Sequence, residues 1–213
     1  MGSRRIGGPA GMSNNDDVLP MTLDTPGRRT IHTRRVQCTG YQRSDGLFDI
    51  EAELHDISAA DTDLLFKIVA AGGTIHHMRV IMTVDRDLVI QDLQAQLPTG
   101  PTPYCSAIEP AYSALKGLQI RSGFRQQVKA IVGGARGCTH LTELLGPLAT
   151  TAMQTILAIK RSERSARKAG EARDDAQPMP KPLLIDSCHT YREDGMAAKI
   201  LWPEGRRAAR ETT

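Results

Sequence analysis

A stretch of strict alternation between residues 47 and 56 constrains the fold more than any other feature of the chain. Four apolar residues there alternate with four polar ones, namely Phe48, Ile50, Ala52 and Leu54 against Asp49, Glu51, Glu53 and His55. A period of two is typical of a strand with one buried face and one polar face. Further strands are predicted at residues 34–41, 74–85 and 88–93. The four strands pair into two hairpins, which favours an antiparallel meander of about four strands with one covered face.

The pattern changes from strands to helices after the Pro-rich loop at residues 98–103. Apolar residues then recur at three- and four-residue spacing, which predicts helices at residues 105–118, 124–132 and 139–164. Pro147 lies inside the last helix, so a kink is expected just before it. A short helix is also predicted between the hairpins, at residues 61–71. Strands followed by helices indicate an α+β domain with three helices packed on one face of the sheet.

Composition divides the chain into five segments. The core domain is predicted to span residues 29–160. A disordered arm at residues 1–28 precedes it. It is followed by a charged, Pro-rich linker at residues 161–182, a docking element at residues 183–203 and a disordered tail at residues 204–213. The arm and the tail lack apolar periodicity, whereas the docking element returns to an ordered character around Trp202.

Charge and hydropathy exclude several classes of function. Net charge is +3 and aromatic residues make up 4% of the chain, so no nucleic-acid partner is expected. No apolar run approaches the roughly 20 residues that span a bilayer, and the N-terminus does not resemble a secretory signal. The expected protein is therefore cytoplasmic, with no membrane partner, and its four cysteines are expected to be reduced.

The stretch at residues 137–145 carries the most chemistry. It predicts a helix start with Cys138 at the positive end of the helix dipole, and with His140 and Glu143 on one face. Cys105 begins another helix, and His76 begins a strand at the same end of the sheet. Thiolate and imidazole ligands suit zinc, iron or an iron–sulfur cluster. We therefore predict metal binding by the two cysteines and two histidines, with Glu143 moving protons; the alternative is unrelated core and capping residues.

Neighbouring residues restrict this prediction. His76 and His77 are adjacent in a strand and point to opposite faces, so they cannot both serve one site. The acidic face of the strand at residues 47–56 could line a second site or simply be solvated.

Several segments of the chain resemble a bacterial family known as domain of unknown function 2889. They are SDGLFDIEA at 44–52, IHHM at 75–78, YCSAIEPAY at 104–112, GCTHLTELL at 137–145 and DSCH at 186–189. The resemblance covers about residues 30–203 and implies no activity.

From Met78 to about Lys160 the order of elements is also similar to that of the U-type iron–sulfur scaffold proteins. The matching segments are Cys105-Ser106-Ala107-Ile108, Lys116-Gly117 and Cys138-Thr139-His140. The resemblance implies a scaffold-like core and a metal pocket. The first scaffold cysteine would fall near Thr74 and is missing, and the scaffold's adjacent His-Cys pair is here reversed and separated by Thr139. These departures favour a mononuclear metal with a general base over cluster assembly.

Three functions follow from these residues. The first is a metal-dependent lyase or hydrolase, with zinc or iron, that acts on a small anionic molecule held by Arg79 or Arg121. The second is a non-catalytic carrier of metal or of an iron–sulfur cluster. The third is a thiol enzyme with Cys138 as nucleophile and His140 as base. The expected partner is a small-molecule substrate, and a homodimer is an open alternative.

Overall fold

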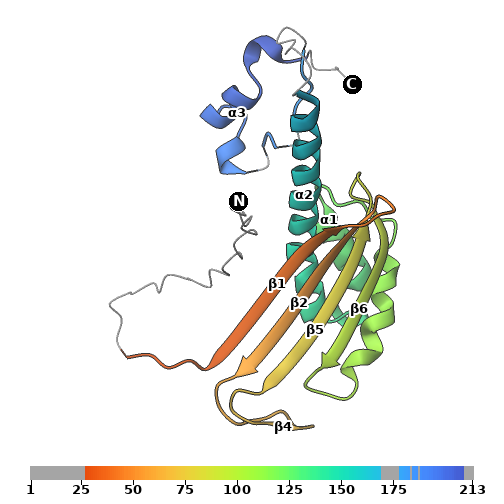
Figure 1. Ribbon diagram of the computed structural model, residues 1–213. Helices are drawn as coiled ribbons and strands as arrows, with labels where there is room; N and C mark the ends of the chain where they lie inside the picture. Colours follow the sequence, from red (N-terminus) through yellow and green to blue (C-terminus); the bar gives the residue numbers. More distant parts are fainter. Residues whose placement is uncertain (1–26, 169–177, 183, 187, 209–213) are drawn as a thin grey trace, which may run out of the picture.

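The computed structural model describes residues 27–168, 178–182, 184–186 and 188–208. Its centre is a four-stranded antiparallel sheet in the order β1-β2-β5-β6 (Figure 1). The strands span His32–Gln42, Phe48–Ser58, Thr74–Val84 and Ile90–Thr99, respectively. The predicted meander of four strands is thus confirmed.

A two-stranded hairpin replaces the short helix predicted between β2 and β5. It consists of β3, Thr62–Asp63, and β4, Ile68–Val69. The helix prediction is wrong because local hydrogen bonds favour a turn: the Asp63 carboxylate accepts the Leu65 N–H at 2.9 Å, and Leu65 has a φ of 68°. Leu65 and Ile68 are also exposed, so their helical spacing does not reflect a buried face.

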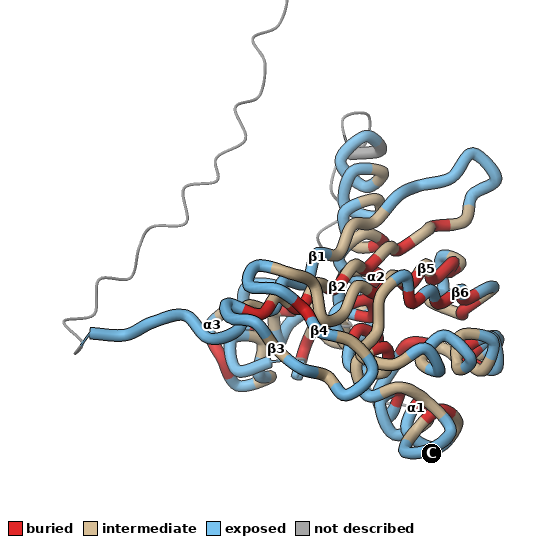
Figure 2. The backbone as a smooth tube through the Cα atoms, turned by 90° about the horizontal axis from the view of Figure 1, so that it is seen from below, coloured by how far each residue is buried: buried red, intermediate tan, exposed pale blue. Residues whose placement is uncertain are grey.

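The helices follow the sheet in the chain and cover one of its faces. They are the 3₁₀ helix η1, Cys105–Leu115, then α1, Phe124–Val132, the short η2, Gly134–Arg136, and α2, Thr139–Lys168. The long helix α2 runs through Pro147 and lies against β1, β2 and β5 (Figure 2). At Gly40, β1 and α2 approach each other so closely that a Cβ atom on this residue would collide with the Thr155 hydroxyl of α2. The α+β fold class is confirmed.

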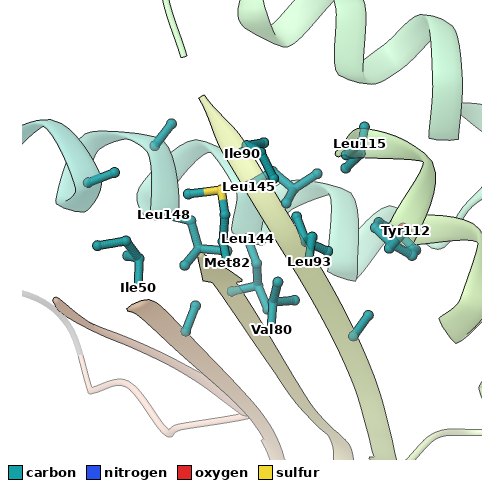
Figure 3. Close-up of a cluster of buried hydrophobic side chains, with 14 of the residues drawn as sticks. Ile50, Val80, Met82, Ile90, Leu93, Tyr112, Leu115, Leu144, Leu145 and Leu148 are labelled. Carbon is teal, nitrogen blue, oxygen red and sulfur yellow. The ribbon is translucent and has the colours of Figure 1, made fainter. Parts of the chain in front are cut away.

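The hydrophobic core lies between α2 and the sheet. Burial alternates along β2 as the period of two predicts, with Phe48, Ile50 and Leu54 buried. Figure 3 shows Leu144, Leu145 and Leu148 of α2 packed over β5 and β6. One end of this covered face carries polar side chains in place of apolar ones.

The C-terminal residues form a small unit of their own. It contains η3, His189–Tyr191, α3, Met196–Leu201, and η4, Glu204–Arg206. Its cluster of Ile185, Ala198 and Trp202 is separate from the main core. α3 lies away from the sheet, towards the C-terminal end of α2 (Figure 1).

The predicted segment boundaries fall partly outside the described residues. The arm lies outside them as far as residue 26, and the last five residues of the tail do as well. Within the predicted linker, residues 161–168 belong to α2 and residues 169–177 are not described. No helix in the described ranges has both the length and the apolar character needed to cross a membrane.

Candidate functional site

A buried carboxylate ends the apolar face of β2. Asp56 follows Leu54 in the same phase as the core residues, and it is only 1% exposed. In the strand register Asp56 lies opposite Arg34 of β1 and His76 of β5. Directly paired residues in a sheet point to the same face, so these three side chains form one row across three strands.

Both oxygens of Asp56 are fully hydrogen-bonded. Oδ1 accepts from Arg34 Nε at 2.7 Å and from His32 Nε2 at 3.1 Å. Oδ2 accepts from Arg34 Nη2 at 2.8 Å and from His76 Nδ1 at 3.0 Å. Burial alone would raise the pKa of Asp56, but the hydrogen bonds from Arg34 and His32 outweigh it and lower this pKa to about 2. Asp56 is therefore an ionised carboxylate at neutral pH.

The hydrogen bond to Asp56 fixes which ring nitrogen of neutral His76 carries the proton. An ionised carboxylate only accepts, so the proton of neutral His76 lies on Nδ1 and the lone pair on Nε2. Burial, followed by the neighbouring His140, lowers the pKa of His76. The ring is therefore neutral at pH 7, with a free nitrogen available for a metal or a proton.

His140, from the first turn of α2, lies against His76. The two ring centroids are 4.1 Å apart, with an interplanar angle of 36°. One donor atom from each of Asp56, His76 and His140 lies within 4.8 Å of the others. We call these three residues the Asp–His–His cluster. Two of the four predicted metal ligands, one from β5 and one from α2, are thus brought together.

Glu143 lies one turn further along α2 and is tied to the same cluster through Arg34. Its Oε2 accepts from Arg34 Nη1 at 2.8 Å, while the other nitrogens of that guanidinium contact Asp56. The Glu143 side chain is 60% exposed. The predicted general base is therefore close to the cluster and open to solvent, with its charge balanced by an arginine.

Cys138 lies immediately before the first residue of α2. Its carbonyl accepts the Thr142 N–H at 2.9 Å, so Cys138 occupies the N-cap position. The buried Tyr112 hydroxyl holds it in place: it donates to the Cys138 carbonyl at 2.8 Å and accepts the Cys138 N–H at 2.9 Å. The sulfur lies 3.9 Å from His140 Nδ1. The third predicted ligand is thus beside one histidine of the cluster.

Cys105 lies elsewhere. Its sulfur contacts the Thr102 hydroxyl at 3.2 Å and lines a hollow together with Phe66 of the β3–β4 hairpin. Cys138 lines a different groove, between α1 and α2. In the described part of the chain, two groups of three potential ligands have their donor atoms within 4.8 Å of one another, and neither contains Cys105. The structure therefore does not bring the fourth predicted ligand to the cluster.

The second of these groups lies on the open face of the sheet. It consists of Glu53, His55 and His77. The rings of the two histidines stack with centroids 4.2 Å apart, and Glu53 Oε1 lies 2.6 Å from His77 Nε2. The expectation that His76 and His77 serve different faces is therefore confirmed. Arg79 shares this open face and lies 4.0 Å from Glu51, so it does not adjoin the Asp–His–His cluster.

Three residues of the site were not predicted from the sequence, namely Asp56, Arg34 and Tyr112. A signal for Asp56 was present in the sequence. It occupies the next position on the buried face of β2, where the alternation predicts an apolar residue. Arg34 then follows from the strand register, which fixes its partner. Tyr112 had no signal of its own, because its role depends on how η1 meets the start of α2.

Comparison with known families matches residues 32–154 to the family described as "Protein of unknown function (DUF2889)". The match includes every residue of the Asp–His–His cluster, together with Arg34, Cys138 and Glu143. No curated protein and no solved structure matches the chain. The similarity to iron–sulfur scaffold proteins stays a prediction.

Proposed function

This chain belongs to the DUF2889 family, and we propose that within it the protein is a metal-dependent enzyme whose zinc or iron ion is bound at the Asp–His–His cluster. The observation that carries the proposal is the arrangement of Asp56, His76 and His140. A carboxylate that orients a histidine by its Nδ1–H, leaving Nε2 for a metal, is a recurrent arrangement at metal sites. The ring of His140 supplies a second imidazole beside the His76 ring, with the two centroids 4.1 Å apart.

Asp56 fits the role of an orienting group better than that of a ligand. Its two oxygens already accept four hydrogen bonds, from Arg34, His32 and His76. A metal bound directly to Asp56 would have to displace one of these donors, and the charge-assisted hydrogen bonds that hold the buried carboxylate would be reduced. We therefore assign metal ligation to His76 and His140.

Cys138 is the best third ligand in the described residues. Zinc–sulfur and zinc–nitrogen bonds of about 2.3 and 2.0 Å at a tetrahedral angle place sulfur and nitrogen roughly 3.5 Å apart. The Cys138 sulfur and His140 Nδ1 are 3.9 Å apart, close to that value. The sulfur is not within 4.8 Å of the whole cluster, so it completes the site only by moving towards the ion. A site with two imidazoles and one thiolate favours zinc over iron.

The chemistry proposed is hydrolysis or elimination on a small anionic molecule. A zinc or iron ion with an open position polarises a carbonyl or acidifies a bound water. Glu143 is the exposed carboxylate beside the site, and it is placed to take or give a proton. Its hydrogen bond to Arg34 keeps it on the same side of α2 as the cluster.

Elemental analysis of the purified protein tests the metal assignment. We expect about one equivalent of zinc or iron in the native protein and loss of most of it in His76→Ala and His140→Ala. His77→Ala is a matched control, because it removes the adjacent histidine on the opposite face of the same strand. Metal contents that are equal in His76→Ala and His77→Ala would overturn the assignment.

A thiol enzyme is a second candidate, supported by the distance of 3.9 Å between the Cys138 sulfur and His140 Nδ1. In this mechanism Cys138 is the nucleophile and His140 the base. The two candidates differ in what Cys138→Ser does to the metal. Metal content falls in this variant if the cysteine is a ligand, and is unchanged if the cysteine acts only as a nucleophile.

A further inference from the structure

A groove of about 500 Å³ lies between α1 and α2, beside the start of α2. Its floor is apolar and is made by core residues of both helices, among them Phe124, Val128 and Leu145. Its volume is that of a pocket for a small organic molecule. The groove is therefore a candidate binding site with an apolar interior.

The rim of the groove is positively charged. Arg125 and Lys129 both line it, four residues apart on α1. Across the described ranges, neither makes a salt bridge or a side-chain hydrogen bond. The one acidic residue on the rim, Glu143, is neutralised by Arg34. Two unpaired cations above an apolar floor are complementary to a molecule with an apolar body and an anionic head.

We infer that this groove binds an organic carboxylate with an apolar chain or ring, its carboxylate held by Arg125 and Lys129 and its body on the apolar floor. The anion-binding residues then differ from Arg79 and Arg121, the two arginines predicted for this role from the sequence. Arg79 lies on the open face of the sheet. Arg121 lines a neighbouring hollow that shares Arg125 with the groove but does not include Lys129, and Arg121 does not line the groove itself.

The groove adjoins the proposed metal site. Cys138 and Glu143 line it, and the same two residues contact His140 and Arg34, respectively. That the carboxylate is a substrate, rather than only a ligand, rests on the proposed function. Binding of the carboxylate does not depend on the proposed function, because Arg125, Lys129 and the apolar floor are independent of the metal.

Calorimetric titration with octanoate tests this inference, with octan-1-ol and acetate as partial probes. We expect octanoate to bind at least about tenfold more tightly than octanol, which lacks the negative charge, or acetate, which lacks the long apolar chain. The Arg125→Gln/Lys129→Gln variant should bind octanoate about tenfold more weakly. Arg121→Gln is the matched control and should bind it as the native protein does.

Equal binding of octanoate and octanol, or undiminished binding in the double variant, would overturn the inference. Circular dichroism establishes that each variant is folded. Titrating His76→Ala separates this inference from the metal proposal: octanoate binding should persist there. Absence of octanoate binding in a native protein that retains its metal would refute the groove assignment alone.

Discussion

Single residues show how a buried charge is stabilised in this protein. Asp56 lies among core residues, where an unpaired carboxylate would cost several kcal/mol. Arg34, His32 and His76 together supply four hydrogen bonds to it, and this pairing lowers its pKa to about 2. The same pairing sets the orientation of His76. The stability of the fold and the geometry of the proposed site thus depend on one side chain.

The low pKa of Asp56 predicts an acid-sensitive stability. Its pKa is about 2 in the folded protein against an ordinary value of 3.8, so the ionised form stabilises the fold above pH 4. This contribution of about 2 kcal/mol is lost as the pH falls from about 4 towards 2. Urea unfolding between pH 5 and 2.5 should show the loss.

The matched variants for this measurement are Asp56→Asn and Asp87→Asn. Asp56→Asn should be less stable by about 2–4 kcal/mol at neutral pH and should lack most of the acid-dependent loss. Asp87 is exposed and on a turn, so Asp87→Asn should follow the native profile. An acid profile of Asp56→Asn that parallels the native one would show that other groups cause the loss.

The sequence predicted these residues unevenly. The period of two in β2 identified its buried and polar faces, and helical spacing identified α2 and the residues at its start. Which thiol adjoins the histidines could not be predicted, because it depends on how η1 and α2 lie over the sheet. Cys105 is the first residue of η1 and Cys138 immediately precedes α2, yet only Cys138 reaches a histidine of the cluster.

At the scale of elements, the beginning of α2 is anchored by Tyr112 of η1. The buried hydroxyl bonds both backbone groups of Cys138 and also lies 2.9 Å from the Thr142 hydroxyl. Burial raises the pKa of this hydroxyl, so it stays protonated and can donate. The position of Cys138 and His140 over β5 therefore depends on the contact between η1 and α2, although η1 contributes no residue to the cluster.

Tyr112→Phe tests this anchor. Removing the hydroxyl leaves the Cys138 N–H without its partner, whereas the Cys138 carbonyl keeps its bond from the Thr142 N–H. We therefore expect a loss of about 1–3 kcal/mol in the free energy of unfolding. Hydrogen exchange at the Cys138 amide should also become faster. Tyr41→Phe is the control, because Tyr41 is 48% exposed and should change stability little. Equal effects of the two substitutions would show that Tyr112 contributes only its ring.

At the scale of the whole molecule, the chain has two hydrophobic clusters of very different size. The larger joins the sheet, η1, α1 and α2, and the smaller joins Ile185, Ala198 and Trp202 with Met179. Trp202 is the only tryptophan of the chain, and it also carries Arg207 over its ring at 4.5 Å. Its fluorescence therefore reports on the small unit alone.

Two probes of unfolding should consequently disagree. Far-ultraviolet circular dichroism follows mainly the sheet and α2, whereas tryptophan fluorescence follows the small cluster, which buries much less apolar surface. We expect the fluorescence transition at a lower urea concentration than the dichroism transition. Coincident transitions would mean that the C-terminal unit unfolds together with the sheet.

The central claim is that His76 and His140 bind one metal ion beside Asp56. X-ray absorption at the edge of the metal that co-purifies with the protein, or of zinc added to it in one equivalent, tests this most directly. We predict two imidazoles and one sulfur around the ion, the sulfur at about 2.3 Å, with one imidazole lost in His76→Ala. A spectrum with fewer than two imidazoles in the native protein, or one that His76→Ala leaves unchanged, would contradict the claim.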